Sequence, residues 1–352
     1  MILDLCQIEI MLKDLLMADK FSFLSPKSLK QGSLLISEFF PKENKIVINP
    51  LIIDPHKLED NVLQKEFFKL KSITLNSFLR AGLLSPTNLD EVGKTISKWD
   101  DILLGVDTNL FYFCGLTNFL LNSYSYNQRK SFFDNPNWIA FIIPAAVLGE
   151  IENKANYTKD SFGKRVSLRA LQEIFLLKRS SDVSGVSVFV SGSMALSVEP
   201  NKVIRDYLIR EQFKEFVKNL DFNKGAYFVT ADRACASISK AEGIKTLFVK
   251  MPELEKEIEL FSSNRANISE IIYEFAVSFS PLVLKIEKDG KESEIKFEIN
   301  WNSKDLSDWE KWKINMSIIK DELNMLNFEK TDFHKKMLQG WNMVLARKSL
   351  ED

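Results

Sequence analysis

The sequence predicts an α/β protein with a central parallel sheet flanked by helices, a mostly helical N-terminal region and an α+β C-terminal region. Two observations predict this class. Between residues 101 and 250, short apolar segments alternate with longer segments of helical period, the pattern of a parallel sheet covered on both faces. After Pro252 the alternation stops. The 352 residues therefore divide into three regions, 1–100, 101–250 and 251–352.

The N-terminal region, 1–100, contains two segments of helical spacing. Residues 58–84 repeat apolar side chains with a helical period, and residues 85–99 follow as a second helix with a polar start. Residues 45–55, KIVINPLIIDP, predict short extended segments closed by prolines. Helical spacing dominates, so we expect this region to be mostly helical.

The middle region supplies five predicted strands with helices between them. The strands are expected at 101–107, 138–144, 186–190, 226–230 and 244–249. The helices are expected at 109–124, 145–156, 161–180, 203–220 and 232–243. We expect the first strand, DILLGVD, to lie at the centre of a parallel sheet.

The C-terminal region begins with two predicted helices, at 254–261 and 268–279. Residues 282–300 then show two alternating segments around Asp289-Gly290, which predicts an antiparallel hairpin outside the central sheet. A tail rich in Trp and Lys is predicted to be helical.

Composition excludes several classes of protein. The formal net charge is −1, so the overall charge indicates no polyanionic partner. The chain has only two His, so a His-based zinc site or a Ser-His triad is improbable. Its three Cys are widely spaced and odd in number, which predicts a reducing, cytoplasmic location. No apolar run reaches membrane-spanning length, so we expect no membrane partner.

Four acids follow predicted strands or begin the helices between them: Asp107, Glu150, Asp206 and Asp232. Sites in open parallel sheets lie outside the carboxyl ends of the strands, so these side chains are all compatible with one edge. Carboxylates gathered there repel one another unless a cation neutralises them. A set of oxygen ligands without His or Cys favours Mg²⁺ or Mn²⁺.

Each acid also has a simpler interpretation. Asp107 and Asp232 both precede helices, where Asp is a favoured N-cap. Glu150 and Asp206 taken singly would be solvated acids on helix faces. The four together favour a shared site, because capping accounts for neither Glu150 nor the common edge.

These residues lie in stretches that resemble the PIN-domain (PilT N-terminus) nucleases. The stretches are GVDTNLFY, PAAVLGEIENK, RDYLIREQFKEF and YFVTADRACASISKAEGIKTLFV, and the resemblance covers about residues 101–250. It implies that Asp107, Glu150, Asp206 and Asp232 are the catalytic, metal-binding acids, with Asn109 and Thr230 in support. The third acid varies in the family, and Glu211 lies about one helical turn beyond Asp206.

The resemblance implies a metal-dependent endonuclease that hydrolyses phosphodiester bonds, chiefly in RNA. Basic residues outnumber acidic ones between 101 and 250. We expect substrate binding by Lys164, Arg165, Arg169 and Arg233. The alternative for the basic helix at 161–180 is a solvated helix face with ion pairs between residues one turn apart. The Trp residues of the tail could stack bases, or pack as core anchors. These are Trp301, Trp309, Trp312 and Trp341.

Other functions fit the residues less well. A phosphatase of the haloacid dehalogenase type needs a second Asp where this chain has Asn109, and no GxxxxGK loop indicates an NTPase. The main alternative is a catalytically inactive PIN scaffold that binds RNA or a protein partner. The flanking regions could position a substrate, inhibit the site or form a homo-oligomer.

Overall fold

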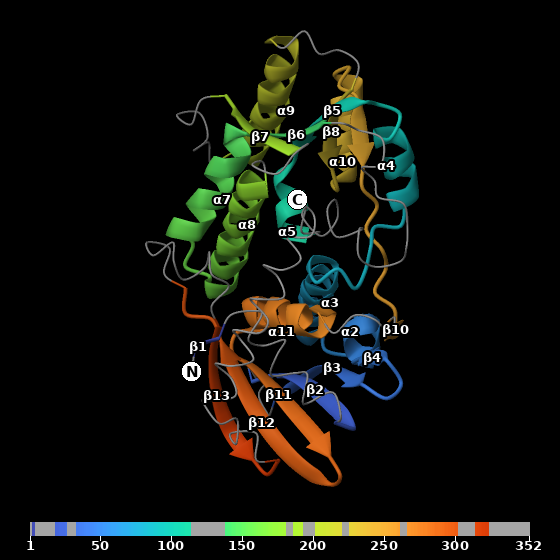
Figure 1. The fold of residues 1–352 in the computed structure, drawn as a ribbon, viewed down its shortest axis with the longest axis vertical. Coiled ribbons are helices and arrows are strands. Elements are labelled where there is room, and N and C mark those ends of the chain that lie inside the picture. The colour runs from blue at the N-terminus through green and yellow to red at the C-terminus, as the bar shows by residue number, and fades with distance from the viewer. Residues whose placement is uncertain are drawn as a thin grey trace, which may run out of the picture.

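The computed structural model contains two β-sheets with helices between them (Figure 1). It describes residues 2–3, 18–26, 33–113, 138–180, 186–192, 201–219, 225–260, 266–301 and 314–323. One sheet is parallel and comes from the middle of the chain. The other is antiparallel and combines strands from both ends of the chain.

The parallel sheet has five strands in the order β7-β6-β5-β8-β9. They are β5 (Asp101–Val106), β6 (Trp138–Pro144), β7 (Val186–Ser191), β8 (Ala226–Thr230) and β9 (Thr246–Phe248). The parallel sheet and the central place of β5 confirm the prediction. Every residue of β5 after the exposed Asp101 is buried, as a strand covered on both faces requires.

Helices flank the parallel sheet where the sequence predicted them. They are α5 (Thr108–Phe113), α7 (Ala145–Tyr157), α8 (Ser161–Ser180), α9 (Lys202–Asn219) and α10 (Arg233–Ala241). The rest of the helix predicted at 109–124 lies outside the described residues. The α9 helix packs closely over β5, because a Cβ atom at Gly105 would overlap the ring of Phe213.

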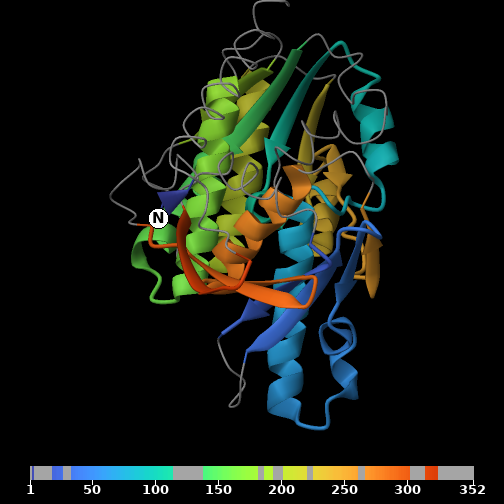
Figure 2. The ribbon, with the colours of Figure 1, turned by 60° about the horizontal axis from the view of Figure 1, so that its bottom comes forward.

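The antiparallel sheet has eight strands in the order β1-β13-β12-β11-β2-β3-β4-β10. They are β1 (Ile2–Leu3), β2 (Lys20–Ser25), β3 (Leu34–Phe40), β4 (Lys45–Ile48), β10 (Glu257–Glu259), β11 (Leu282–Lys288), β12 (Lys291–Glu298) and β13 (Ile314–Asp321). Figure 2 shows the blue N-terminal strands beside the orange C-terminal hairpin. The two flanking regions of the sequence therefore contribute to one sheet.

The hairpin of β11 and β12 confirms one prediction, and other parts of this sheet correct the sequence reading. Asp289 and Gly290 adopt positive φ angles of 50° and 74°, as a tight primed turn needs. The helix predicted at 254–261 is wrong, because that segment contains β10, which pairs with the edge strand β4. The prediction of a helical tail is wrong at Ile314–Asp321, which form β13. Apart from residues 301, 322 and 323, the rest of the tail lies outside the described part.

Two helices lie between the sheets: α3 (Asn61–Arg80) and α11 (Ala266–Phe279) (Figure 1). Both confirm predicted helices, as does α4 (Leu89–Ile96). Short turns at α2 (Pro50–Ile53) and η1 (Pro55–Lys57) precede α3. The α11 helix contacts α3, α8 and β11, so it connects the two halves. None of the helices that the structure describes is long and apolar enough to cross a membrane.

Candidate functional site

The candidate site lies where the parallel sheet changes direction. Counted from β5, the chain adds β6 and β7 on one side and then β8 and β9 on the other. Ligands of open α/β sheets bind in the crevice at such a switch point, outside the carboxyl ends of the strands. Asp107 follows β5 and Thr230 ends β8, and the Asp107 N–H donates to the Val229 carbonyl at 3.1 Å. The two strand ends are therefore adjacent.

Asp107 is held by the two polar residues that the sequence predicted as its support. Its Oδ2 accepts hydrogen bonds from the Thr230 hydroxyl at 2.5 Å and from the Asn109 amide at 2.6 Å. The Asn109 amide also donates to Thr230, and its oxygen accepts the Ala231 N–H. These bonds fix the orientation of the Asp107 carboxylate at the end of the strand.

The Asp107 carboxyl group is 7% exposed, and burial raises its pKa from 3.8 to about 6. The hydrogen bonds from Thr230 and Thr108 act in the opposite direction, while the negative charges of Asp206 and Glu150 raise the pKa further. Ionised Asp107 is therefore unfavourable in this environment, and part of the cost comes from two neighbouring acids.

Glu150 lies in the second turn of α7 and is already paired. Its Oε1 accepts from the Lys154 ammonium at 2.8 Å, and its Oε2 accepts from the Thr108 hydroxyl at 3.0 Å. The Arg205 guanidinium lies 3.3 Å from the same Oε2. Two cations thus neutralise Glu150 in this conformation.

Asp206 and Asp232 differ in how they are engaged. Asp206, on α9, is half-buried, and its pKa is raised by burial and by the charge of Glu150 against the attraction of Lys202. Among the described residues its carboxylate makes no hydrogen bond or ion pair. Asp232 is the N-cap of α10, where its Oδ1 accepts from the N–H groups of Ala234 at 2.7 Å and Cys235 at 3.0 Å. The capping interpretation of Asp232 is therefore confirmed.

The fit of this site to a metal ion is incomplete in the conformation described. Carboxylate oxygens without His or Cys suit Mg²⁺ or Mn²⁺ in chemistry. Within the described part of the chain, however, no group of three or more Asp, Glu, His or Cys is arranged to hold a metal ion. A cation that uses Glu150 would have to replace Lys154 and Arg205 as its partners.

The basic helix α8 faces inward, which corrects the expected role of two of its residues. Arg165 and Arg169 are 8% and 3% exposed. Arg165 donates to the Val277 carbonyl at 2.7 Å, and Arg169 donates to Glu274 at 2.7 Å. These guanidinium groups stabilise the contact of α8 with α11 and are not available to a phosphate. Lys164 is half-buried, and Arg233, beside Asp232, is exposed.

The sequence reading missed three residues that contact the acids: Thr108, Lys154 and Arg205. Lys154 carried a signal, because a Lys four residues after Glu150 lies on the same face of a helix. Glu274 also carried a signal in the sequence, because a lone acid in the apolar segment IIYEFAV predicts a buried cationic partner.

Trp301 is buried and stacks at an angle on Tyr273, so it is a core anchor. Trp309, Trp312 and Trp341 lie outside the described residues.

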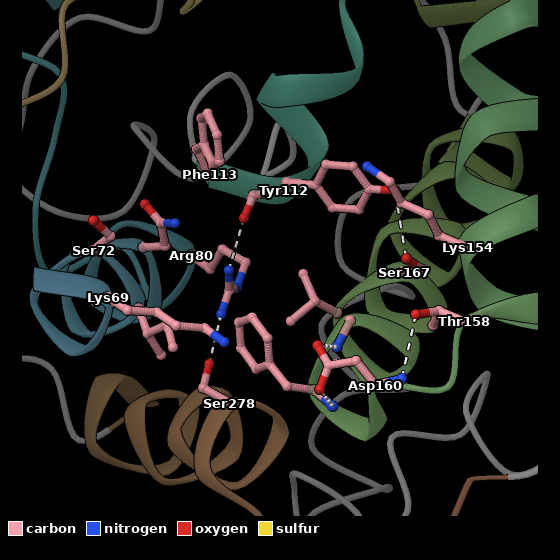
Figure 3. Close-up of a pocket in the computed structure, with 15 residues that line it drawn as sticks. Lys69, Ser72, Arg80, Tyr112, Phe113, Lys154, Thr158, Asp160, Ser167 and Ser278 are labelled. Carbon is pink, nitrogen blue, oxygen red and sulfur yellow. Dashed lines mark hydrogen bonds between the residues drawn. The ribbon is translucent and has the colours of Figure 1, made fainter. Parts of the chain in front are cut away.

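A cavity of about 530 Å³ lies beside this site (Figure 3). It opens between α3, α5 and α8, and Lys154 of α7 lines it. Because the same Lys154 ammonium pairs with Glu150, the cavity and the acids share a wall.

Comparison with known proteins assigns no family. No protein-family model matches the chain, and no curated protein matches it. One similar solved structure is described as a domain of a functionally unknown protein from Methanocaldococcus jannaschii DSM 2661. It is 21% identical, with a TM-score of 0.32, and the match covers 45% of this chain and 96% of that one.

Proposed function

We propose that the protein is a divalent-metal-dependent endonuclease that cleaves RNA at the end of the parallel sheet. One observation carries this proposal. Asp107 is buried at the switch point, oriented by two hydrogen bonds, and repelled by Asp206 and Glu150. Carboxyl groups held together at the cost of mutual repulsion, with raised pKa values, are typical of functional sites.

RNA as the substrate rests on the resemblance of the ordered acids to PIN-domain nucleases. Asp107, Glu150 and Asp206 would hold Mg²⁺ or Mn²⁺, and Asp232 would add the carboxylate oxygen that does not cap α10. When bound, such an ion neutralises phosphate charge and lowers the pKa of an attacking water. Thr230 and Asn109 keep Asp107 in one orientation, and Lys154 and Arg205 supply positive charge beside Glu150.

The alternative is an inactive scaffold of the same fold that binds RNA or a protein without cutting it. The pairing of Glu150 favours this function. Lys154 and Arg205 already pair with its carboxylate oxygens, so no metal ion is needed to balance its charge. A substrate or partner would then meet a surface of fixed ion pairs.

Cleavage assays with matched variants separate the two functions. Single-stranded RNA, hairpin RNA and single-stranded DNA are incubated with the protein in EDTA and in Mn²⁺. Asp107→Asn is expected to lower Mn²⁺-dependent RNA cleavage by about 100-fold or more. Asp101→Asn is the control, because Asp101 lies at the opposite, exposed end of the same strand.

Two results would favour the scaffold. One is full Mn²⁺-dependent cleavage by Asp107→Asn. The other is a wild-type melting temperature that Mn²⁺ leaves unchanged, because a bound cation stabilises the folded state by mass action.

A further inference from the structure

The cavity beside the acids has the size and the position of a ligand site. At about 530 Å³ it falls in the range of small-molecule pockets. It lies where α3, one of the helices between the two sheets, meets α5 and α8 of the parallel half (Figure 3). Its floor includes Arg80, whose guanidinium is fully engaged with Glu274, Ser278 and the Tyr112 carbonyl. The floor is therefore rigid.

The cavity presents positive charge and one free amide. Lys69 reaches into it from α3, and its ammonium lies 5.9 Å from the centre of the Phe162 ring (Figure 3). No carboxylate in the described residues lies within ion-pair distance of Lys69. Asn76, about two turns further along the same face of α3, lines the cavity, and its side chain has no hydrogen-bond partner among those residues. Both groups are available to a ligand.

One acidic residue also lines the cavity. Asp160 lies at the start of α8, where its Oδ1 accepts the Phe162 N–H at 3.2 Å and its Oδ2 accepts the Gly163 N–H at 3.0 Å. Both of its oxygens therefore bind the start of the helix, although its negative charge remains. Of the cations that line the cavity, Lys69 has no ion-pair partner among the described residues.

Aromatic rings form the other walls of the cavity. Phe162 lines it from α8, and Tyr112 and Phe113 line it from α5. The Lys154 ammonium lies 4.7 Å from the centre of the Tyr112 ring and 2.8 Å from Glu150 Oε1. Rings, ammonium groups and a free amide are what a nucleotide needs: a face to stack on, charge for its phosphate and a donor–acceptor pair for the base edge.

We infer that this cavity binds one nucleotide, with its base against Phe162 and Asn76 and its phosphate near Lys69 and Lys154. Lys154 then joins the nucleotide to the acids, so a strand that enters the cavity continues past Glu150 and Asp107. That the nucleotide belongs to an RNA substrate rests on the proposed function, whereas binding in the cavity does not.

Binding measured in EDTA tests the inference without cleavage. The full chain is titrated with a fluorescent single-stranded RNA and with adenosine monophosphate. Lys69→Glu and Phe162→Leu are each expected to weaken RNA binding by about tenfold, since stacking and phosphate contacts have this size. Lys94→Glu, on the exposed side of α4, makes the same charge change away from the cavity and is expected to have a much smaller effect. Melting temperatures identify any variant that fails to fold.

The outcomes separate this inference from the proposed function. If adenosine monophosphate competes with RNA, the cavity binds a free nucleotide. If RNA binds through the cavity and adenosine monophosphate does not, the cavity binds a nucleotide only as part of an RNA strand. Either of two results overturns the inference. One is that Lys69→Glu binds both ligands as tightly as wild type does. The other is that Lys94→Glu weakens binding as much as Lys69→Glu does. Wild type that binds through the cavity but never cleaves in Mn²⁺ overturns the proposed function and leaves the nucleotide site standing.

Discussion

Two buried carboxyl groups of this protein have pKa values that shift in opposite directions. One belongs to Glu274, on α11, and the other to Asp107, at the end of β5. Burial by itself raises both pKa values. At Glu274 the guanidinium groups of Arg169 and Arg80, each 2.7 Å from one carboxylate oxygen, outweigh burial and lower the pKa. At Asp107 the neighbours are hydroxyl, amide and two more acids, so the pKa rises to about 6.

Under the proposed function, the difference separates a structural carboxylate from a metal-binding one. Glu274 has a cation for each oxygen, so its charge is compensated within the fold and nothing further can bind there. Asp107 accepts hydrogen bonds that orient it, and two nearby acids destabilise its negative charge. No cation among the described residues compensates that charge, so a bound metal ion would stabilise it. Four predictions test this contrast.

The largest effect is expected from Glu274→Gln. The change leaves Arg80 buried without this anion and leaves Arg169 with Glu173, 3.8 Å away. Removing one partner of a buried ion pair costs about 3–5 kcal/mol. Urea unfolding measures the loss, with the exposed Glu255→Gln as control. A loss below about 1 kcal/mol would show that Glu274 is not the structural member of the contrast.

The next largest effect is a dependence of the free energy of unfolding on pH, which comes from Asp107. Its carboxyl binds a proton more tightly in the folded protein than in the unfolded chain, so its contribution to stability is highest below pH 3.8 and is lost as the pH rises to about 6. At about 1.4 kcal/mol per pKa unit, this amounts to about 3 kcal/mol.

Asp107→Asn removes that dependence. Without metal, the variant is expected to unfold at higher urea concentration than wild type at pH 7.5, and the difference should vanish near pH 4. The measurement is the difference between the two proteins across pH, because other acids titrate equally in both. A variant less stable than wild type at pH 7.5 would contradict the raised pKa.

A smaller effect is expected at Asp232, which both caps α10 and borders the site. Asp232→Ala should lose about 0.5–2 kcal/mol of stability with or without Mn²⁺, because the cap is lost. Asp232→Asn keeps a capping oxygen and should be nearly as stable as wild type. If the carboxylate also serves the metal, both variants lose RNA cleavage; normal cleavage by Asp232→Asn would reduce Asp232 to a cap.

The smallest effect on stability is expected from Arg205→Gln. The ion pair with Glu150 is partly exposed, so its loss should cost no more than about 1 kcal/mol. Because the change removes the cation beside Glu150 Oε2 and leaves only the Thr108 hydroxyl there, Mn²⁺ should raise the melting temperature of the variant more than that of wild type. An equal rise in both proteins would show that Glu150 does not compete between Arg205 and the metal ion.

Local features of this protein could be predicted from its sequence because they depend on neighbouring residues. The apolar run of β5, the polar residues that follow it and the Asp289-Gly290 turn all formed as their local patterns indicated. The support of Asp107 by Asn109 and Thr230 could also be predicted, since parallel strands bring their carboxyl ends to one edge.

Other features were decided only by tertiary structure. The strand β2 pairs with β11 across more than half of the chain, and no local pattern specifies a partner so distant. The α8 helix is covered by α11, so Arg169 meets Glu274 in the interior, although its spacing in the sequence equally suits a solvated basic face. The sequence by itself determined the strands and helices of the parallel half and which acids follow its strands. The packing of α3 and α11 against the parallel half decided which charges are buried and paired, because burial depends on contacts between distant segments.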